Sequence, residues 1–335
     1  MIQNKQSPRP APKCFAVPAL ILLAFLVNLV VLSGCGNSMS APTPPPPPPT
    51  PSPSVFRFVV WADTRGGNTT LAALSTQALT LNPAFTLYAG DGESQGFTIA
   101  GTNRFLSAID GDASNGVSAK TFFVRGNHDA LDTSGWQQHY ELEAVAGAVG
   151  ATHYTAFTAD LTYSFDYQNS HFVGIDVPGD ADIITPAQIS WLDSDLATAE
   201  VRGLTHAFLF FHGPIYCIES LHCGFSEKSG SSTPEALIEV LNKHELVSAS
   251  FHGHEHVLAH THMDMTRLPS LTHDFEQIVA GTAGAPSYAC DLPLRTEWCD
   301  SVNGFATVEV SGRTVRVNFY QQGISTPVKT VDFSK

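Results

Sequence analysis

The sequence has little charge, and its basic residues are scarcer than its acidic ones. Only 14% of the 335 residues are charged, and 17 lysines and arginines stand against 31 aspartates and glutamates. So low a charge excludes a coiled coil and a disordered acidic chain. No basic stripe is present, which argues against nucleic-acid binding. Hydrophobic residues make up 43%, and the length suits one large domain or two ordinary ones.

The N-terminal segment has the residue order of an export signal. Three basic residues precede a mostly apolar run over residues 15–32, which is typical of a secretory signal. The run ends in Leu-Ser-Gly-Cys, which resembles the bacterial lipoprotein cleavage box, where the cysteine, here Cys35, becomes the lipidated first residue. We therefore predict that residues 1–34 are a lipoprotein signal peptide. The alternative is an uncleaved anchor, because the run is near the shortest length that spans a bilayer.

A proline-rich stretch follows the signal. Residues 42–54 read PTPPPPPPTPSPS, and proline both fixes φ and lacks an N–H, so this stretch favours an extended polyproline form. We assign residues 35–54 to a semi-rigid linker and residues 55–335 to one domain. The sequence thus predicts a protein that is exported and lipid-anchored to the cell envelope, at the periplasmic or the outer surface.

Four of the six cysteines lie outside the targeting segment. An even number in an exported chain favours two disulfides, and a thiolate metal site is the weaker alternative because no C-x-x-C spacing occurs. The favoured of three pairings joins the sequence neighbours, Cys217 with Cys223 and Cys290 with Cys299. These cysteines lie in loops over residues 214–232 and 286–304, which either wall a substrate pocket or are surface decoration.

Apolar runs and helical periodicity alternate along the first part of the domain, which is typical of a parallel α/β layer. Strands are predicted over 55–62, 85–89 and 121–124, with helices over 69–81 and part of 97–108. Further on, the patterns predict a hairpin over 161–176, helices over 186–199 and near 234–243, and strands over 207–211, 246–251, 275–281, 305–310 and 314–320. We interpret this order as one domain with two sheets.

Five polar clusters lie at the ends of predicted strands. They are Asp63-Thr64-Arg65, Gly90-Asp91, Gly126-Asn127-His128-Asp129, His212 and Gly253-His254-Glu255-His256. Because ligands gather beyond the carboxyl ends of strands in open α/β sheets, we expect these clusters to converge. Carboxylate, amide and imidazole donors suit Zn, Mn or Fe. Two such ions bridged by a carboxylate can clamp a phosphoryl group.

The order and spacing of these clusters across roughly residues 55–260 resemble the calcineurin-like metallophosphoesterase family, and GNHD followed by GHxH is a specific combination. The resemblance implies a four-layer α/β/β/α sandwich with two mixed sheets flanked by helices. It also implies an enzyme that hydrolyses phosphate monoesters or diesters with a metal-bridging hydroxide. The implied cofactors are two divalent ions (Mn, Fe or Zn), and the implied substrate is a small phosphorylated molecule.

The resemblance further implies a role for each motif residue. The ligand assignment is Asp91 as the bridge, Asp63 and His256 at the first site, and Asn127, His212 and His254 at the second. His128 would stabilise the phosphoryl oxygens and protonate the leaving group, and Asp129 would orient its imidazole. Glu255 would point away from the ions toward the surface.

Two residues depart from the family pattern. Arg65 stands where the family usually has a ligating histidine, and Ser94 where it often has an aspartate or a tyrosine. Arginine has no acceptor, so either a water completes the first site or that site binds its ion weakly. Arg65 would instead hold a substrate phosphate oxygen, the alternative being a structural ion pair. The same replacement favours an alternative function, an exported lipoprotein that binds phosphate or a partner without turnover.

Overall fold

The structure is a computed structural model that describes residues 55–111, 116–136, 140–177, 184–218, 222, 233–291 and 295–335. The predicted signal peptide, the predicted linker and Cys223 lie outside the described residues. Within the described ranges, no helix is both long enough and apolar enough to cross a membrane.

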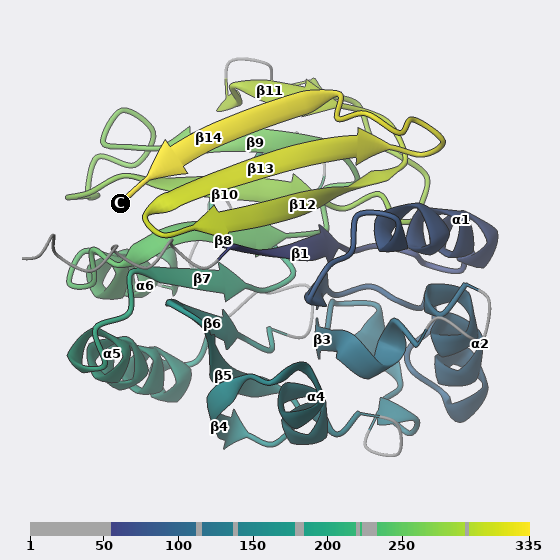
Figure 1. Cartoon of the computed structure of the whole chain (residues 1–335), viewed down its shortest axis with the longest axis horizontal. Helices are drawn as coiled ribbons and strands as arrows, with labels where there is room; N and C mark the ends of the chain where they lie inside the picture. Colours follow the sequence, from purple (N-terminus) through teal and green to yellow (C-terminus); the bar gives the residue numbers. More distant parts are fainter. Residues whose placement is uncertain are drawn as a thin grey trace, which may run out of the picture. The chain divides into compact units, whose positions relative to one another are not determined.

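The first sheet has six strands in the order β14-β13-β12-β1-β2-β3 (Figure 1). Their bounds are β1 Val55–Trp61, β2 Phe85–Ala89, β3 Thr121–Val124, β12 Gly304–Ser311, β13 Thr314–Gln321 and β14 Lys329–Ser334. The β1, β2 and β3 strands are parallel, and their crossovers run through α1 (Asn68–Leu79) and through α2 (Ile99–Ile109) with η1 (Ser118–Lys120). The remaining pairs are antiparallel, so the sheet is mixed.

The second sheet has eight strands in the order β11-β9-β10-β8-β7-β6-β5-β4. Their bounds are β4 Thr152–Thr158, β5 Thr162–Tyr167, β6 Ser170–Gly174, β7 His206–Phe210, β8 Val247–His252, β9 Leu258–Met263, β10 Phe275–Ala280 and β11 Trp298–Asp300. This sheet is also mixed, with β6, β7, β8 and β10 parallel. The other described helices are η2 Asp129–Leu131, α4 Leu142–Val149, α5 Pro186–Val201 and α6 Thr233–Leu241.

Aromatic side chains fill the space between the two sheets. The ring of Phe58 on β1 lies 5.2 Å from that of Phe172 on β6, and 5.6 Å from those of Phe208 on β7 and Phe251 on β8. On the outer face of the second sheet, apolar residues of α5 and α6 join a separate buried cluster with β7 and β8. Figure 1 shows α1 and α2 on the opposite side of the molecule from α5 and α6. The predicted four-layer sandwich is therefore confirmed.

Most predicted elements are confirmed, because their sequence signals are local. The β5–β6 hairpin crosses residues 168–169, and α5 begins at Pro186 with a capping box between Thr185 and Gln188. The prediction missed α4, β4, β9, β11 and β14. The Cys290–Cys299 disulfide is confirmed. Cys217 is also disulfide-bonded, while Cys223, its predicted partner, lies outside the described residues.

Candidate metal centre

The five polar clusters lie just beyond the ends of β1, β2, β3, β7 and β8, and several of their residues have unusual backbone conformations. A positive φ is rare outside glycine, and functional sites often concentrate it. Half of the eight described non-glycine residues with positive φ belong to the motifs: Asp63 at 58°, Arg65 at 45°, Asp91 at 57° and His254 at 66°. The chain therefore turns sharply where the candidate ligands project.

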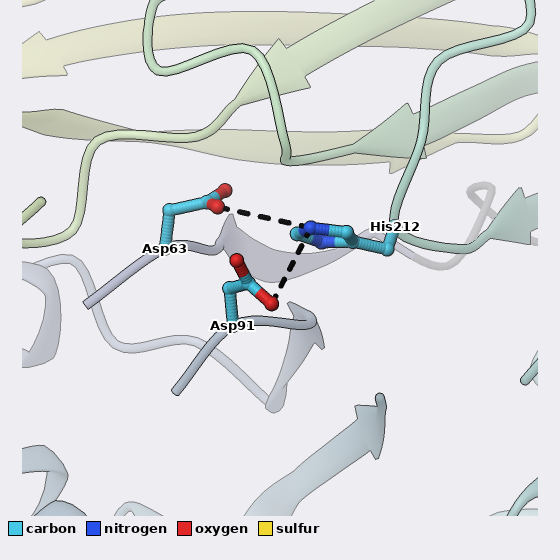
Figure 2. Close-up of side chains that lie close together, drawn as sticks. All are labelled: Asp63, Asp91 and His212. Carbon is cyan, nitrogen blue, oxygen red and sulfur yellow. Dashed lines mark ion pairs between the residues drawn. The ribbon is translucent and has the colours of Figure 1, made fainter. Parts of the chain in front are cut away.

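Three buried side chains form the centre of the site, as Figure 2 shows. Nε2 of His212 lies 3.5 Å from Oδ1 of Asp91 and 3.9 Å from Oδ1 of Asp63. One ligand atom from each of the three residues lies within 4.8 Å of the other two. Side chains from the ends of β1, β2 and β7 thus converge, as the strand-end argument predicts.

The remaining predicted ligands lie around this group. Nε2 of His256 lies 3.3 Å from Oδ1 of Asp63. Oδ1 of Asn127 lies 3.2 Å from Nε2 of His212 and 3.3 Å from Nδ1 of His254. The backbone N–H of His254 donates to Oδ2 of Asp63 at 2.8 Å. The structure therefore brings all six sequence-predicted ligands together, and their individual ligand roles stay a prediction.

Backbone carbonyls set the tautomer of two histidines. Nδ1 of His212 donates to the Ala89 carbonyl at 2.8 Å, and Nδ1 of His256 donates to the Pro286 carbonyl at 2.8 Å. Metal-binding histidines commonly donate their second ring N–H in this way. In the neutral form of both residues, which is the form that binds a metal, the lone pair is therefore on Nε2, which faces the carboxylates. Oδ1 of Asp63 and Nε2 of His256 are buried and have no hydrogen-bond partner among the described residues.

The site stabilises positive charge. Burial would raise the pKa of Asp91, but His212 and then His128 lower that pKa to about 2. Burial would lower the pKa of His212, but the carboxylates of Asp91 and Asp63 raise it to about 10. A buried pair of carboxylates requires a cation, which can be a proton on imidazole or a metal ion.

The donor set fits divalent ions. Oxygen and nitrogen ligands lie about 2.0–2.2 Å from a metal such as zinc, so two ligands of one ion lie roughly 3–4 Å apart. The separations of 3.3 Å and 3.5 Å that join His256 to Asp63 and His212 to Asp91 fall in this range. An ion would also give a partner to the two buried atoms that lack one.

His128 lies beside this group, but Asp129 does not orient it. Nδ1 of His128 pairs with the Ser94 carbonyl at 3.0 Å, and its backbone N–H donates to Oδ1 of Asp91 at 2.9 Å. The Asp129 carboxylate instead accepts backbone N–H groups from Asp91, Glu93 and Gly126. The predicted contact is therefore wrong, because three backbone donors that must be satisfied inside the protein occupy the carboxylate. Asp129 holds the turns that present Asp91 and Asn127.

Ser94, which sequence analysis noted only as a departure from the family pattern, connects two predicted functional residues. Its hydroxyl donates to the Arg65 carbonyl at 2.6 Å, while its own carbonyl pairs with His128. Arg65 is half-buried, and within the described ranges its guanidinium has no ion-pair partner. The structural ion pair considered as its alternative role therefore has no partner in that part of the chain.

Two further residues of the site differ from sequence expectation. Glu255 is buried rather than at the surface, because its carboxylate accepts the Ile218 N–H at 2.9 Å. Tyr88, in the interior of β2, bonds Thr64 through its hydroxyl, at 3.0 Å to the backbone N and 2.7 Å to Oγ1. An aromatic residue in an apolar strand ordinarily packs in the core, so its sequence context gave no functional signal.

The sequence matches the family profile described as calcineurin-like phosphoesterase over residues 56–258, which is more than half of the chain. The chain belongs to this family. It is therefore a metal-dependent hydrolase of phosphate esters, and its cofactors are divalent metal ions. No curated protein matches the sequence significantly.

Several solved structures resemble the chain in fold. The purple acid phosphatase PPD1 of yellow lupin (Lupinus luteus) aligns with a TM-score of 0.63 at 15% identity, over 84% of this chain and 54% of that one. A dimetal phosphatase from Danio rerio aligns with a TM-score of 0.56 at 15% identity, over 83% and 98%. GAP50, described as the anchor in the inner membrane complex of Plasmodium, aligns at 0.57 and 17% identity, over 84% and 89%. The chain thus spans about half of the lupin protein's length.

Proposed function

We propose that this calcineurin-like phosphoesterase is an exported lipoprotein that hydrolyses a small phosphate ester with two divalent ions. The observation that carries the proposal is the convergence of six oxygen and nitrogen donors, among which Oδ1 of Asp63 and Nε2 of His256 are buried with no hydrogen-bond partner in the part of the chain that the structure describes. The tether would be a lipid on Cys35, on the strength of the Leu-Ser-Gly-Cys box.

Each ligand has a place in this proposal. Divalent ions, when bound, would act as Lewis acids that polarise the phosphoryl oxygens and lower the pKa of water. Asp91 would be the ligand that both ions share. Two observations support this role: its Oδ1 lies 3.5 Å from Nε2 of His212, and the same oxygen accepts the backbone N–H of His128. The other assignments are Asp63 and His256 for one ion, and Asn127, His212 and His254 for the other.

His128 would protonate the leaving oxygen of the ester. The Ser94 carbonyl can only accept a hydrogen bond, so Nδ1 of His128 carries a proton and Nε2 is the atom available for proton exchange. A positioned acid of this kind typically contributes 10²- to 10⁴-fold to a rate. Arg65 would bind a phosphate oxygen through its guanidinium, a role supported by its half-buried place between Asp63 and α1.

The test is hydrolysis of 4-nitrophenyl phosphate and of bis(4-nitrophenyl) phosphate by the chelator-treated chain, with and without added Mn²⁺ or Zn²⁺. We expect turnover of at least one ester only with metal, and two ions per chain by elemental analysis. Asp91→Asn should lose both turnover and metal, since it removes the shared charge. His128→Ala should lose about 10²- to 10⁴-fold in kcat and keep its metal.

Asp332→Asn is the matched control, because Asp332 is an exposed residue of β14 that pairs with Arg316 far along the chain from every motif. It should match the unaltered chain in both assays. A chain that bound inorganic phosphate but hydrolysed neither ester under any metal condition would contradict the proposal and support the binding lipoprotein instead.

A further inference from the structure

The ring of Tyr288 stacks on the imidazole of His256. The two ring centroids are 4.0 Å apart, and the ring planes differ by 13°. The backbone N–H of Tyr288 also donates to the His256 carbonyl at 2.9 Å. Tyr288 therefore contacts both the backbone and the side chain of this residue.

The other face of the Tyr288 ring is covered as well. His222 stacks on it with a centroid distance of 4.0 Å and an interplanar angle of 13°. The hydroxyl of Ser301 donates to the Tyr288 carbonyl at 2.5 Å. A ring held between two others and tied by its backbone on two sides has little freedom to tilt, so it presents a fixed surface to His256.

The support behind this stack is a small buried apolar cluster. It consists of Ile218, Val257, Ala259 and Val279, with Tyr288, Cys290 and Cys299 packed against it. Tyr288 lies two residues before Cys290, the first cysteine of the Cys290–Cys299 disulfide. The Glu255 carboxylate accepts the N–H of Ile218 and so joins the same cluster to the GHxH loop. Both cysteine-bearing loops therefore contact the segment that contains His256.

We infer that Tyr288 is a positioning residue that holds the His256 imidazole in the orientation needed to bind its ion. This inference rests on the proposed function, in which His256 is a ligand. The Pro286 carbonyl holds Nδ1 of His256, and the Tyr288 ring sets the imidazole plane. Together the two constraints direct Nε2 at Oδ1 of Asp63, 3.3 Å away.

This constraint matters at the ion site that has the fewest protein ligands. Arg65 occupies a position that supplies no donor atom, so the ion beside Asp63 depends on few protein groups. Residues that orient a ligand typically contribute 10- to 100-fold to metal affinity or activity. The loss of one orienting residue should therefore weaken this ion selectively.

The test is calorimetric titration of Mn²⁺ or Zn²⁺ into the metal-free full-length chain. Tyr288→Leu keeps an apolar side chain against the disulfide and removes the ring. We expect it to weaken one of the two ions by about 10- to 100-fold and to leave the other unchanged. Tyr288→Phe keeps the ring and should bind both ions within about threefold of the unaltered chain. Tyr154→Leu, a matched change at a half-buried tyrosine of β4, should bind both normally.

Unchanged affinity for both ions in Tyr288→Leu would overturn the inference, as would a loss of equal size in Tyr288→Phe. If the unaltered chain bound fewer than two ions, the proposed function would fail before any variant was compared.

Thermal unfolding of the metal-free variants shows whether each folds. Should Tyr288→Leu not fold, Tyr288→Met, which also removes the ring but is flexible enough to fill the space it leaves, decides instead. Selective weakening of one ion in it supports the inference, and unchanged binding of both overturns it.

Discussion

Gly126 shows how little room the site leaves around a single residue. A Cβ placed there would lie 2.2 Å from Oδ1 of Asp91 and 2.8 Å from Cε1 of His212. We expect Gly126→Ala to displace Asp91, to lower kcat/KM by about 100-fold and to cost about 1–3 kcal/mol of unfolding free energy. Ester hydrolysis and urea unfolding measure the two effects.

Gly147 provides the matched control, because it lies inside α4 and nothing lies within 4 Å of a Cβ placed there. Gly147→Ala should raise the unfolding free energy by about 0.5–1 kcal/mol, since alanine favours a helix, and should leave kcat/KM unchanged. If Gly126→Ala kept full kcat/KM, the turns after β2 and β3 would be able to move apart without displacing the ligands.

Ser94 allows a milder test at the same scale. Ser94→Ala removes the hydrogen bond to the Arg65 carbonyl but keeps the backbone carbonyl that pairs with His128. One such bond is worth about 0.5–1.5 kcal/mol, so we expect kcat/KM to fall about two- to tenfold with no loss of metal. The exposed Ser107 of α2 gives the control variant Ser107→Ala. If Ser94→Ala and Ser107→Ala had equal kcat/KM, Ser94 would play no part in positioning Arg65 and His128.

At the scale of elements, the sequence predicted what is local and missed what depends on distant contacts. Each metal motif follows an apolar run with a clear strand pattern, so the convergence of the motifs followed from topology. Strand β4 was missed because its side chains are mostly exposed on both faces and give no alternation. The buried position of Glu255 depends on Ile218, 37 residues earlier in the chain, and no periodicity reports such a contact.

A buried charge network joins β5, β6 and α5 and should make stability depend on pH. His171 on β6 bonds Asp166 at 2.7 Å and Asp195 at 2.8 Å, and Arg202 also pairs with Asp166. Burial alone would lower the pKa of His171, but the two carboxylates raise it above its ordinary value. The stabilisation is therefore fully present below about pH 6.5 and is lost as the pH rises through the raised pKa.

We expect His171→Leu to lower the unfolding free energy by about 3–5 kcal/mol at pH 6, because it leaves buried carboxylates without this partner. The difference from the unaltered chain should shrink as the pH rises above about 6.5. Urea unfolding of the metal-free chain across this range measures it. His153→Gln is the control, since the His153 side chain is 58% exposed and pairs with the same Asp166. Its effect should stay below about 1 kcal/mol. A constant difference at every pH would contradict the expectation.

At the scale of the whole molecule, the metal centre lies where the two sheets meet. Asp63, Asp91 and Asn127 follow strands of the first sheet, whereas His212, His254 and His256 follow strands of the second. The aromatic rings between the sheets hold these two halves together. Neither sheet alone provides the full donor set, so the site forms only when the sandwich is packed, and ion binding should stabilise that packing.

All of the candidate ligands lie in the compact unit Pro51–Lys335, so the proposed lipid tether would determine where the protein is located and not its catalytic activity. We expect mass analysis of the chain, expressed in an exporting bacterial host, to show a lipid-modified Cys35 as its first residue, and Cys35→Ala to lose that lipid while keeping metal-dependent hydrolysis. Lipidation needs the thiol of that cysteine. Cys14→Ala is the matched control and should keep the lipid on Cys35. An exported chain that still carried residues 15–32 and no lipid on Cys35 would instead support the uncleaved apolar anchor.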